Sequence, residues 1–76
     1  MGNTLSNKFY FENSSTLSCA VYDSLMDNLI VEFKNGSTYE FVGVPKSLFD
    51  DLCSAESAGR FFAANVKSKY DFLKLI

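Results

Sequence analysis

The sequence predicts one α+β domain, a three-stranded antiparallel β-meander followed by two short α-helices packed on one face. Its 76 residues are enough for one domain and too few for two. Between residues 17 and 42, apolar and polar residues alternate as they do in half-buried strands. After Pro45 the apolar residues recur at helical spacing, so the strands precede the helices along the chain.

The first strand is expected to begin at Leu17, where the alternation starts. Leu17, Cys19 and Val21 then share one face, and the residues between them share the other. Before this strand, a short aromatic run is interrupted by a polar break. We therefore expect residues 14–76 to form the domain and residues 1–13 to be an N-terminal arm or an extra edge strand.

Asn35-Gly36 is the strongest turn signal in the chain. A two-residue type I′ turn needs a positive φ at both central residues, and Asn followed by Gly tolerates this best. The second and third strands should therefore pair as a tight hairpin around these two residues. The side chains expected to face the core are Leu29, Val31, Phe33, Tyr39 and Phe41.

Two helices are expected after the sheet. Pro45 suits a first helical turn, and Ser47 with Asp50 three residues later resembles an N-terminal cap. Ser57 is expected to cap the second helix. The residues expected to be buried are Leu48, Phe49, Leu52 and Cys53 in the first helix and Phe61, Phe62, Val66 and Tyr70 in the second.

No set of side chains in the sequence points to catalysis. The chain has no His, which is the commonest general base and a frequent metal ligand. Asp50 and Asp51 are adjacent, so on a helix they would point about 100° apart and could not converge on one bond. Cys19 and Cys53 fit buried free thiols of a reducing cytoplasm, with a disulfide between them as the alternative. We expect no enzymatic activity, metal, cofactor or small-molecule substrate.

Membrane association is not expected either. No apolar run approaches the roughly 18 residues of a membrane-spanning helix. The N-terminus lacks the basic and apolar regions of a signal peptide.

Charge is divided unevenly along this chain of net charge −2. Residues 60–76 carry four basic residues against Asp71 alone, whereas residues 1–59 carry three Lys against eight acidic residues. A basic segment is typical of a solvated helix face, or of a phosphate-binding surface where rings lie nearby. The candidate nucleic-acid contacts are Arg60, Lys67, Lys69, Tyr39 and Tyr22.

Aromatic residues are abundant, with eight Phe and four Tyr making 16% of the chain. Each ring buries on the order of 150–250 Å², so a core of this size needs fewer than twelve. Rings left on the surface are typical anchors of protein interfaces. The candidate interface anchors are Phe9, Tyr10, Phe11 and Phe72.

An ordered set of short segments covers about three quarters of the chain. They are Ser14-Ser15, Val21-Tyr22-Asp23, Leu29-Ile30-Val31-Glu32-Phe33, Gly36, Tyr39-Glu40-Phe41, Val44-Pro45, Ser57-Ala58-Gly59, Phe62 and Tyr70. In this order they resemble the KTSC family, named for a domain at the C-terminus of some lysyl-tRNA synthetases. The family's Tyr-x-Tyr reads Tyr39-Glu40-Phe41 here, so one phenolic hydroxyl is missing, and Lys67 matches its late basic residue.

The resemblance implies a free-standing small protein of bacteria or their phages, located in the cytoplasm of a bacterial host. The family has no established biochemical function, and RNA binding has been suggested from its synthetase context. We expect a non-enzymatic interaction protein, encoded by a phage or mobile element, that binds a host protein or associates with itself as a homo-oligomer. The alternative is an RNA or other nucleic-acid binding module that uses the basic second helix.

Overall fold

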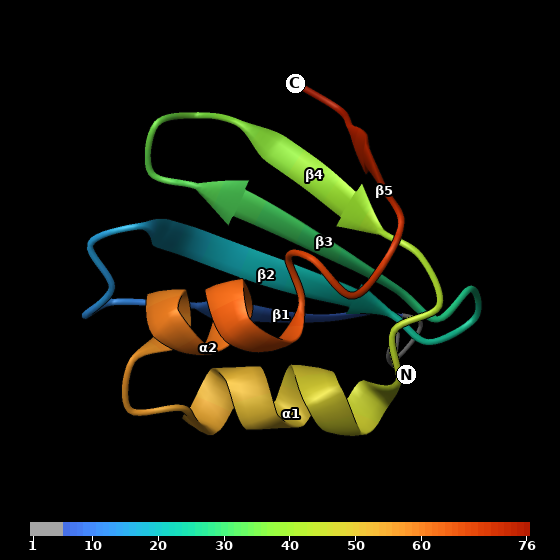
Figure 1. Ribbon diagram of the computed structural model, residues 1–76, viewed down its shortest axis with the longest axis horizontal. Helices are drawn as coiled ribbons and strands as arrows, with labels where there is room; N and C mark the ends of the chain where they lie inside the picture. Colours follow the sequence, from blue (N-terminus) through green and yellow to red (C-terminus); the bar gives the residue numbers. More distant parts are fainter. Residues whose placement is uncertain (1–5) are drawn as a thin grey trace.

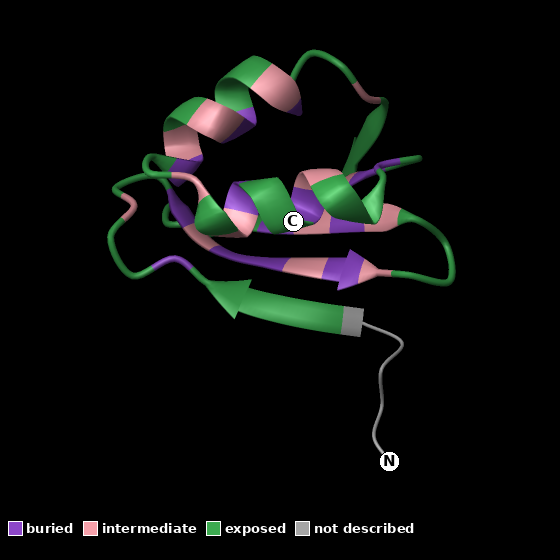
Figure 2. Ribbon diagram, turned by 90° about the horizontal axis from the view of Figure 1, so that it is seen from below, coloured by how far each residue is buried: buried purple, intermediate pink, exposed green. Residues whose placement is uncertain are grey.

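Two helices pack on one face of a five-stranded antiparallel sheet in the computed structural model, which describes residues 6–76 (Figure 1). The strands follow one another across the sheet in chain order, so the sheet is a meander. Figure 2 shows both helices on the same side of the sheet. The elements are β1 (Ser6–Tyr10), β2 (Leu17–Asp23), β3 (Asn28–Phe33), β4 (Thr38–Phe41), α1 (Lys46–Ser54), α2 (Ala58–Asn65) and β5 (Phe72–Lys74).

The α+β class, the antiparallel sheet and the two helices are confirmed, but the prediction of three strands is wrong. The sheet has a further strand at each edge: β1 pairs with β2, and β5 pairs with β4 over only three residues. β5 is too short for alternation to reveal it, whereas β1 was expected only as one of two alternatives for residues 1–13. Of the alternatives for residues 1–13, the described part contains an edge strand, and residues 1–5 lie outside the described residues.

A β-bulge in β2 changes which side chains face the core. Between Leu17 and Cys19 the pairing with β3 shifts by one residue. Ala20 and Tyr22 are consequently the buried side chains on the helix side, while Cys19 and Val21 lie on the opposite face. The prediction that Leu17, Cys19 and Val21 share one face is therefore wrong, because one extra residue reverses the alternation.

The turn between β3 and β4 is one residue longer than expected. The Gly36 amide donates to the Phe33 carbonyl at 2.9 Å, and the Phe33 amide donates to the Ser37 carbonyl at 2.8 Å. The loop therefore consists of Lys34, Asn35 and Gly36. Of Asn35 and Gly36 only Gly36 has a positive φ, at 94°, as in a three-residue hairpin loop. The predicted type I′ turn centred on Asn35-Gly36 is thus wrong.

The longer loop is what places the hairpin's apolar residues on one face. Val31 lies opposite Tyr39, and Leu29 lies opposite Phe41. A two-residue turn would have set Tyr39 opposite Glu32, whose side chain belongs to the other face. The expected inward set is confirmed, because Leu29, Val31 and Phe41 are buried while Phe33 and Tyr39 pack against the core.

The helix boundaries follow the predictions in part. α1 begins directly after Pro45 and no side chain caps it, so the cap expected at Ser47 is wrong. Ser57 Oγ accepts a hydrogen bond from the Arg60 amide at 3.4 Å, which confirms the cap of α2. Among the described residues no helix is long or apolar enough to cross a membrane. Of the residues expected to be buried by the helices, Phe49, Leu52, Phe62 and Val66 are buried, and Leu48, Cys53, Phe61 and Tyr70 are partly buried. α2 ends at Asn65, so the expectation that Val66 and Tyr70 belong to it is wrong.

Phe11 belongs to the hydrophobic core. Its amide donates to the Ser18 carbonyl at 3.0 Å just beyond β1. Its buried ring meets Phe9 edge to face, with 5.1 Å between ring centroids. The prediction that Phe11 anchors an interface is therefore wrong, because this connection turns the ring inward.

Candidate functional site

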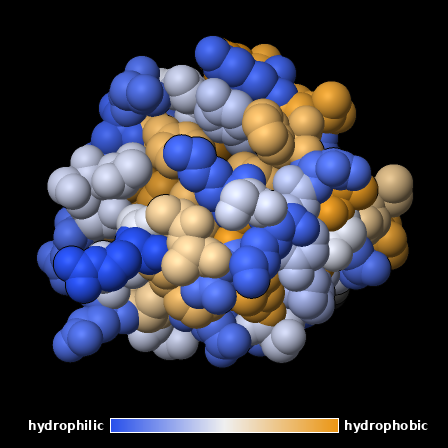
Figure 3. All heavy atoms as spheres, viewed as in Figure 1, coloured by the Kyte–Doolittle hydropathy of each residue, from blue (hydrophilic) through white to orange (hydrophobic). Residues whose placement is uncertain are grey.

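A groove of about 620 Å³ opens between α2, the β3–β4 hairpin and β5. It brings together Tyr39, Lys67 and Phe72, which come from three separate parts of the chain. Figure 3 shows this helix-bearing side of the molecule, where apolar side chains reach the surface between polar ones. The lining residues are Thr16, Phe33, Asn35, Ser37, Tyr39, Phe41, Gly59, Phe62, Ala63, Lys67, Ser68 and Phe72.

Five aromatic rings line this aromatic groove at two depths. Phe41 and Phe62 form its buried floor and meet edge to face, with 5.4 Å between their centroids. Tyr39 lies between Phe33 and Phe72, with centroid distances of 5.6 and 5.5 Å. Phe72 is 50% exposed and Tyr39 is partly exposed, so both offer aromatic surface to a ligand.

Among the residues that the structure describes, Lys67 is the one charged residue that lines the aromatic groove. It is exposed, and it has no carboxylate partner: the only ion pair within residues 6–76 joins Lys46 Nζ to Asp50 Oδ1 at 3.1 Å. Glu40 pairs with Ile30 across β4 and β3 and lies on the face of the sheet away from the helices. The groove is therefore a locally positive surface on a protein of net charge −2.

Three other predicted contacts do not join this groove. Arg60 is exposed on α2 and lines a different hollow, and Lys69 is exposed in the turn after α2. Tyr22 is only 1% exposed, so no ring face is free to stack on a base. The prediction that Tyr22 contacts nucleic acid is therefore wrong.

The polar rim of the groove comes from segments that the sequence did not connect with a site. Asn35 belongs to the β3–β4 loop and Ser37 follows it directly, and Asn35 Oδ1 accepts a hydrogen bond from the Ser37 amide at 2.9 Å. Thr16 comes from the β1–β2 connection. Phe33, Phe41 and Phe62 were expected as core residues alone, and nothing in their spacing distinguishes a core ring from a groove floor.

Two of the segments that resemble the KTSC family, Ser14-Ser15 and Ser57-Ala58-Gly59, make contacts that explain their residue types. Ser14 Oγ accepts hydrogen bonds from the amides of Thr16 at 3.1 Å and Leu17 at 3.0 Å. A Cβ at Gly59 would lie 3.4 Å from Thr16 Oγ1, so α2 packs closely against this connection. These contacts set the position of α2, and hence of Lys67, relative to the sheet.

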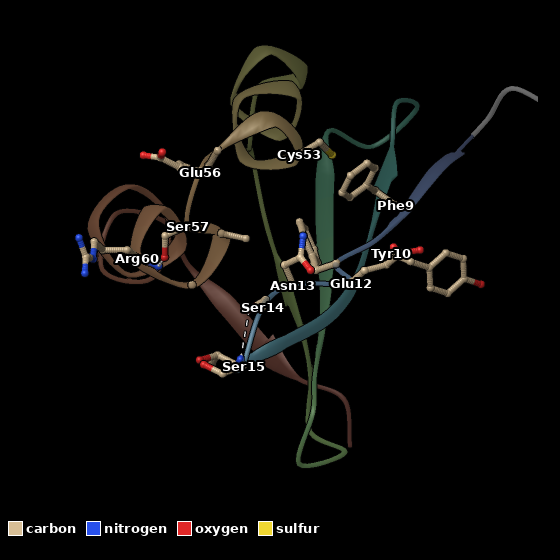
Figure 4. Close-up of a pocket in the computed structure, with 15 residues that line it drawn as sticks. Phe9, Tyr10, Glu12, Asn13, Ser14, Ser15, Cys53, Glu56, Ser57 and Arg60 are labelled. Carbon is tan, nitrogen blue, oxygen red and sulfur yellow. Dashed lines mark hydrogen bonds between the residues drawn. The ribbon is translucent and has the colours of Figure 1, made fainter.

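A second hollow of about 700 Å³ lies between the β1–β2 connection and the α1–α2 connection (Figure 4). It mixes both signs of charge, since Glu12, Glu56 and Arg60 line it. In Figure 4 the Arg60 side chain points away from it. Among the described residues, no three His, Cys, Asp or Glu side chains are grouped to hold a metal ion. This hollow therefore lacks the converging groups of a site.

Both cysteines are free thiols. Burial raises the pKa of the Cys53 thiol to about 11, and the nearby Asp50 carboxylate adds to the rise. Burial also raises the pKa of Cys19, whose Sγ lies 3.5 Å from Glu32 Oε1. Both groups are consequently protonated at neutral pH.

We expect Cys53 to react slowly with iodoacetamide, because only the thiolate is nucleophilic. A pKa of about 11 in place of the ordinary 9.0 lowers the thiolate fraction about 100-fold at pH 8. Site-resolved mass spectrometry of the folded protein measures this rate, and the urea-unfolded chain is the control. Equal rates in both states would contradict the raised pKa.

The comparisons with known proteins agree with this fold. A family model for the KTSC domain matches residues 13–70. The crystal structure of a KTSC domain protein from Yersinia pestis is similar, with a TM-score of 0.83 and 30% identity over 93% of this chain and 99% of that chain.

Several bacterial proteins are also similar to this chain in sequence. A protein of Tsukamurella paurometabola is 42% identical over 57 residues, which are 75% of this chain and 85% of that protein. A lysine–tRNA ligase of Nostoc punctiforme is 39% identical over 54 residues, and one of Trichormus variabilis is 35% identical. The chain spans 10% of the length of these ligases, which places the similarity in one small segment of each. On its matched residues and its fold, the chain belongs to the KTSC domain family.

Proposed function

We propose that this protein is a non-catalytic binding domain that holds a segment of single-stranded RNA in its aromatic groove. The observation that carries the proposal is the placement of Lys67, which has no ion-pair partner within residues 6–76, beside the partly exposed rings of Tyr39 and Phe72. Unpaired bases stack on aromatic side chains, and a nearby amine contacts the phosphates between them.

The distribution of charge favours RNA as the partner over the host protein that the sequence alone favoured. An acidic chain repels a polyanion, but the acids are not evenly placed. Glu32 and Glu40 belong to the face of the sheet away from the groove, and none of the described carboxylates lines the groove itself. One lysine provides only modest affinity, so we expect weak, salt-sensitive binding in which ring stacking supplies most of the free energy.

The lysine–tRNA ligases among the relatives support a nucleic-acid partner. Their name states that they act on tRNA, and each contains a segment similar to this chain. Since the chain spans 10% of their length, the ligation itself is not transferred to it. What the similarity supports is an accessory segment that contacts RNA.

Titration of fluorescein-labelled single-stranded RNA, followed by anisotropy at low and moderate salt, tests the proposal. We expect saturable binding that weakens with salt. Tyr39→Ala should weaken it at least about fivefold, because one stacked base is worth about 1–3 kcal/mol. Lys67→Glu should weaken it and lower the salt dependence by about 0.7 in the logarithmic slope.

Lys46→Glu is the matched control, because it makes the same change of charge on α1, outside the groove. It should leave most of the affinity in place. If no saturable binding appears at low salt, the proposal is wrong. It is equally wrong if Lys46→Glu and Lys67→Glu weaken binding alike, since the groove would then have no special role.

A host-protein partner is the second candidate, and β1 is the observation that favours it. This edge strand carries Phe9, 39% exposed, and Tyr10, 62% exposed. Exposed strand edges accept an added strand from a partner, and exposed rings anchor it. A pull-down from bacterial lysate with Phe9→Ser and Tyr10→Ser as controls tests this alternative. Genomic neighbourhood and cell fractionation would test the predicted phage or mobile-element origin and the cytoplasmic location.

A further inference from the structure

The face of the sheet opposite the helices carries a row of side chains that runs straight across four strands. Lys8 on β1 pairs with Val21 on β2, Val21 pairs with Ile30 on β3, and Ile30 pairs with Glu40 on β4. Paired residues in an antiparallel sheet share a face. The row therefore reads cation, apolar, apolar, anion from one edge toward the other.

Side-chain contacts agree with this assignment. The Asn28 amide donates to Glu40 Oε2 at 2.7 Å, and Cys19 Sγ donates to Glu32 Oε1 at 3.5 Å. Lys8 Nζ lies 4.9 Å from the centroid of the Tyr10 ring. Because these contacts join residues of neighbouring strands or of one strand, the side chains are gathered on a single surface, which we call the open face.

No element of the described chain covers the open face. Both helices lie on the other side of the sheet (Figures 1 and 2). Val21 and Ile30 remain partly exposed at its centre, and Lys8 is exposed at its edge. A partly exposed apolar centre between opposite charges is suited to a partner of matching pattern.

We propose that the open face binds a second copy of this chain, with the two-fold axis parallel to the strands and between β2 and β3. That axis sets β1 of one copy over β4 of the other, and β2 over β3. Lys8 then faces Glu40 of the partner subunit, and Val21 faces Ile30 of the partner subunit. By symmetry each of these contacts occurs twice.

The charge pattern favours this two-fold axis over one that runs along β3. A two-fold axis running along β3 would set Ile30 on its own symmetry mate and Lys8 over Leu73 of the partner subunit, which leaves the charges unmatched. In the proposed arrangement the next row sets Cys19 over Glu32 of the partner subunit, so no two like charges face each other. Aligned packing of two such faces is an ordinary sheet-on-sheet arrangement.

The open face is complementary to itself, which indicates that its binding partner is a second copy of this chain. A surface whose own halves carry opposite charges at equal distances from an apolar centre matches itself under a two-fold rotation. The aromatic groove lies on the other side of the sheet and stays open in this dimer. RNA binding and dimer formation can therefore be lost independently of each other.

Analytical ultracentrifugation over a wide concentration range tests the dimer, using wild type, Lys8→Glu, Glu40→Lys and the double variant. Wild type should dimerise. Either reversal alone should raise the dissociation constant at least about tenfold, because each creates two like-charged contacts per dimer. The double variant restores opposite charges and should restore most of the affinity.

Circular dichroism melts confirm that each variant is folded. Lys8→Glu is the safer single variant, since Lys8 is exposed on the edge strand whereas Glu40 accepts a hydrogen bond from Asn28. A wild-type protein that stays monomeric at every concentration overturns the proposal. The proposal is also overturned if Lys8→Glu leaves the dissociation constant of the dimer unchanged. It is equally overturned if the double variant does not recover the affinity lost in the single variants.

Discussion

Replacing Phe62 by Ala should remove about 3–5 kcal/mol from the free energy of unfolding, the largest single loss that we expect. The Phe62 ring is 3% exposed and holds α2 on the sheet through edge contacts with Phe33 and Phe41, each with centroids 5.4 Å apart. A domain of this length has roughly 4–11 kcal/mol of stability in total. The variant should therefore be close to unfolding at 37 °C.

Urea denaturation followed by circular dichroism measures this loss. Phe72→Ala is the matched control, since the same ring is removed at a residue that is 50% exposed and at the edge of the sheet. We expect it to cost well under half as much, because much of that ring is already in water. If both variants lose the same stability, Phe62 is not the side chain that holds α2 in place.

Replacing Tyr22 by Phe should cost about 1–3 kcal/mol through the loss of one hydroxyl group. The Tyr22 hydroxyl donates to the Val44 carbonyl at 2.6 Å and lies 3.2 Å from Asp27 Oδ1. The Val44 amide also donates to the Asp27 carbonyl at 2.8 Å. The hydroxyl thus ties β2 to the β2–β3 turn and to the connection before α1, and without it the buried Val44 carbonyl loses its donor.

Thermal melts of Tyr22→Phe and Tyr70→Phe separate this effect from a general loss of phenol. Tyr70 is partly buried against the core, and within the described residues its hydroxyl makes no hydrogen bond, so that variant should keep nearly the wild-type melting temperature. Tyr22→Phe should lower it by at least about 4 °C. Equal melting temperatures for the two variants would show that the Tyr22 hydroxyl contributes little.

Alkaline pH offers a second readout for Tyr22. Burial raises its pKa, and the hydrogen bond to Asp27 adds to the rise. A folded pKa above the unfolded value means that the contribution to stability is complete below about pH 10 and is lost as the pH rises beyond it. The difference in stability between wild type and Tyr22→Phe should therefore shrink above pH 10.

The candidate site could be predicted from the sequence only in its parts. Tyr39 and Lys67 were selected as nucleic-acid contacts and Phe72 as an interface anchor, each for a local chemical reason. That they line one groove depends on β5 pairing beside β4 and on α2 lying across the sheet. Three residues of β5 carry too little pattern to predict that pairing. Tyr22 and Phe11 were predicted to offer exposed rings, and that prediction failed for a similar reason. The bulge in β2 and the connection after β1 turn these two rings toward the core.

The sequence by itself determined the α+β class, the two helices and the residues that fill the hairpin core, because these depend on local periodicity, on Pro45 and on the Ser57 cap. It also excluded histidine-dependent chemistry. Only the tertiary structure decided the number of strands, the reversed face of β2 and the three-residue loop before β4. These features arise from pairing between distant segments, where one extra residue exchanges the two faces of a strand and local pattern carries no signal of it.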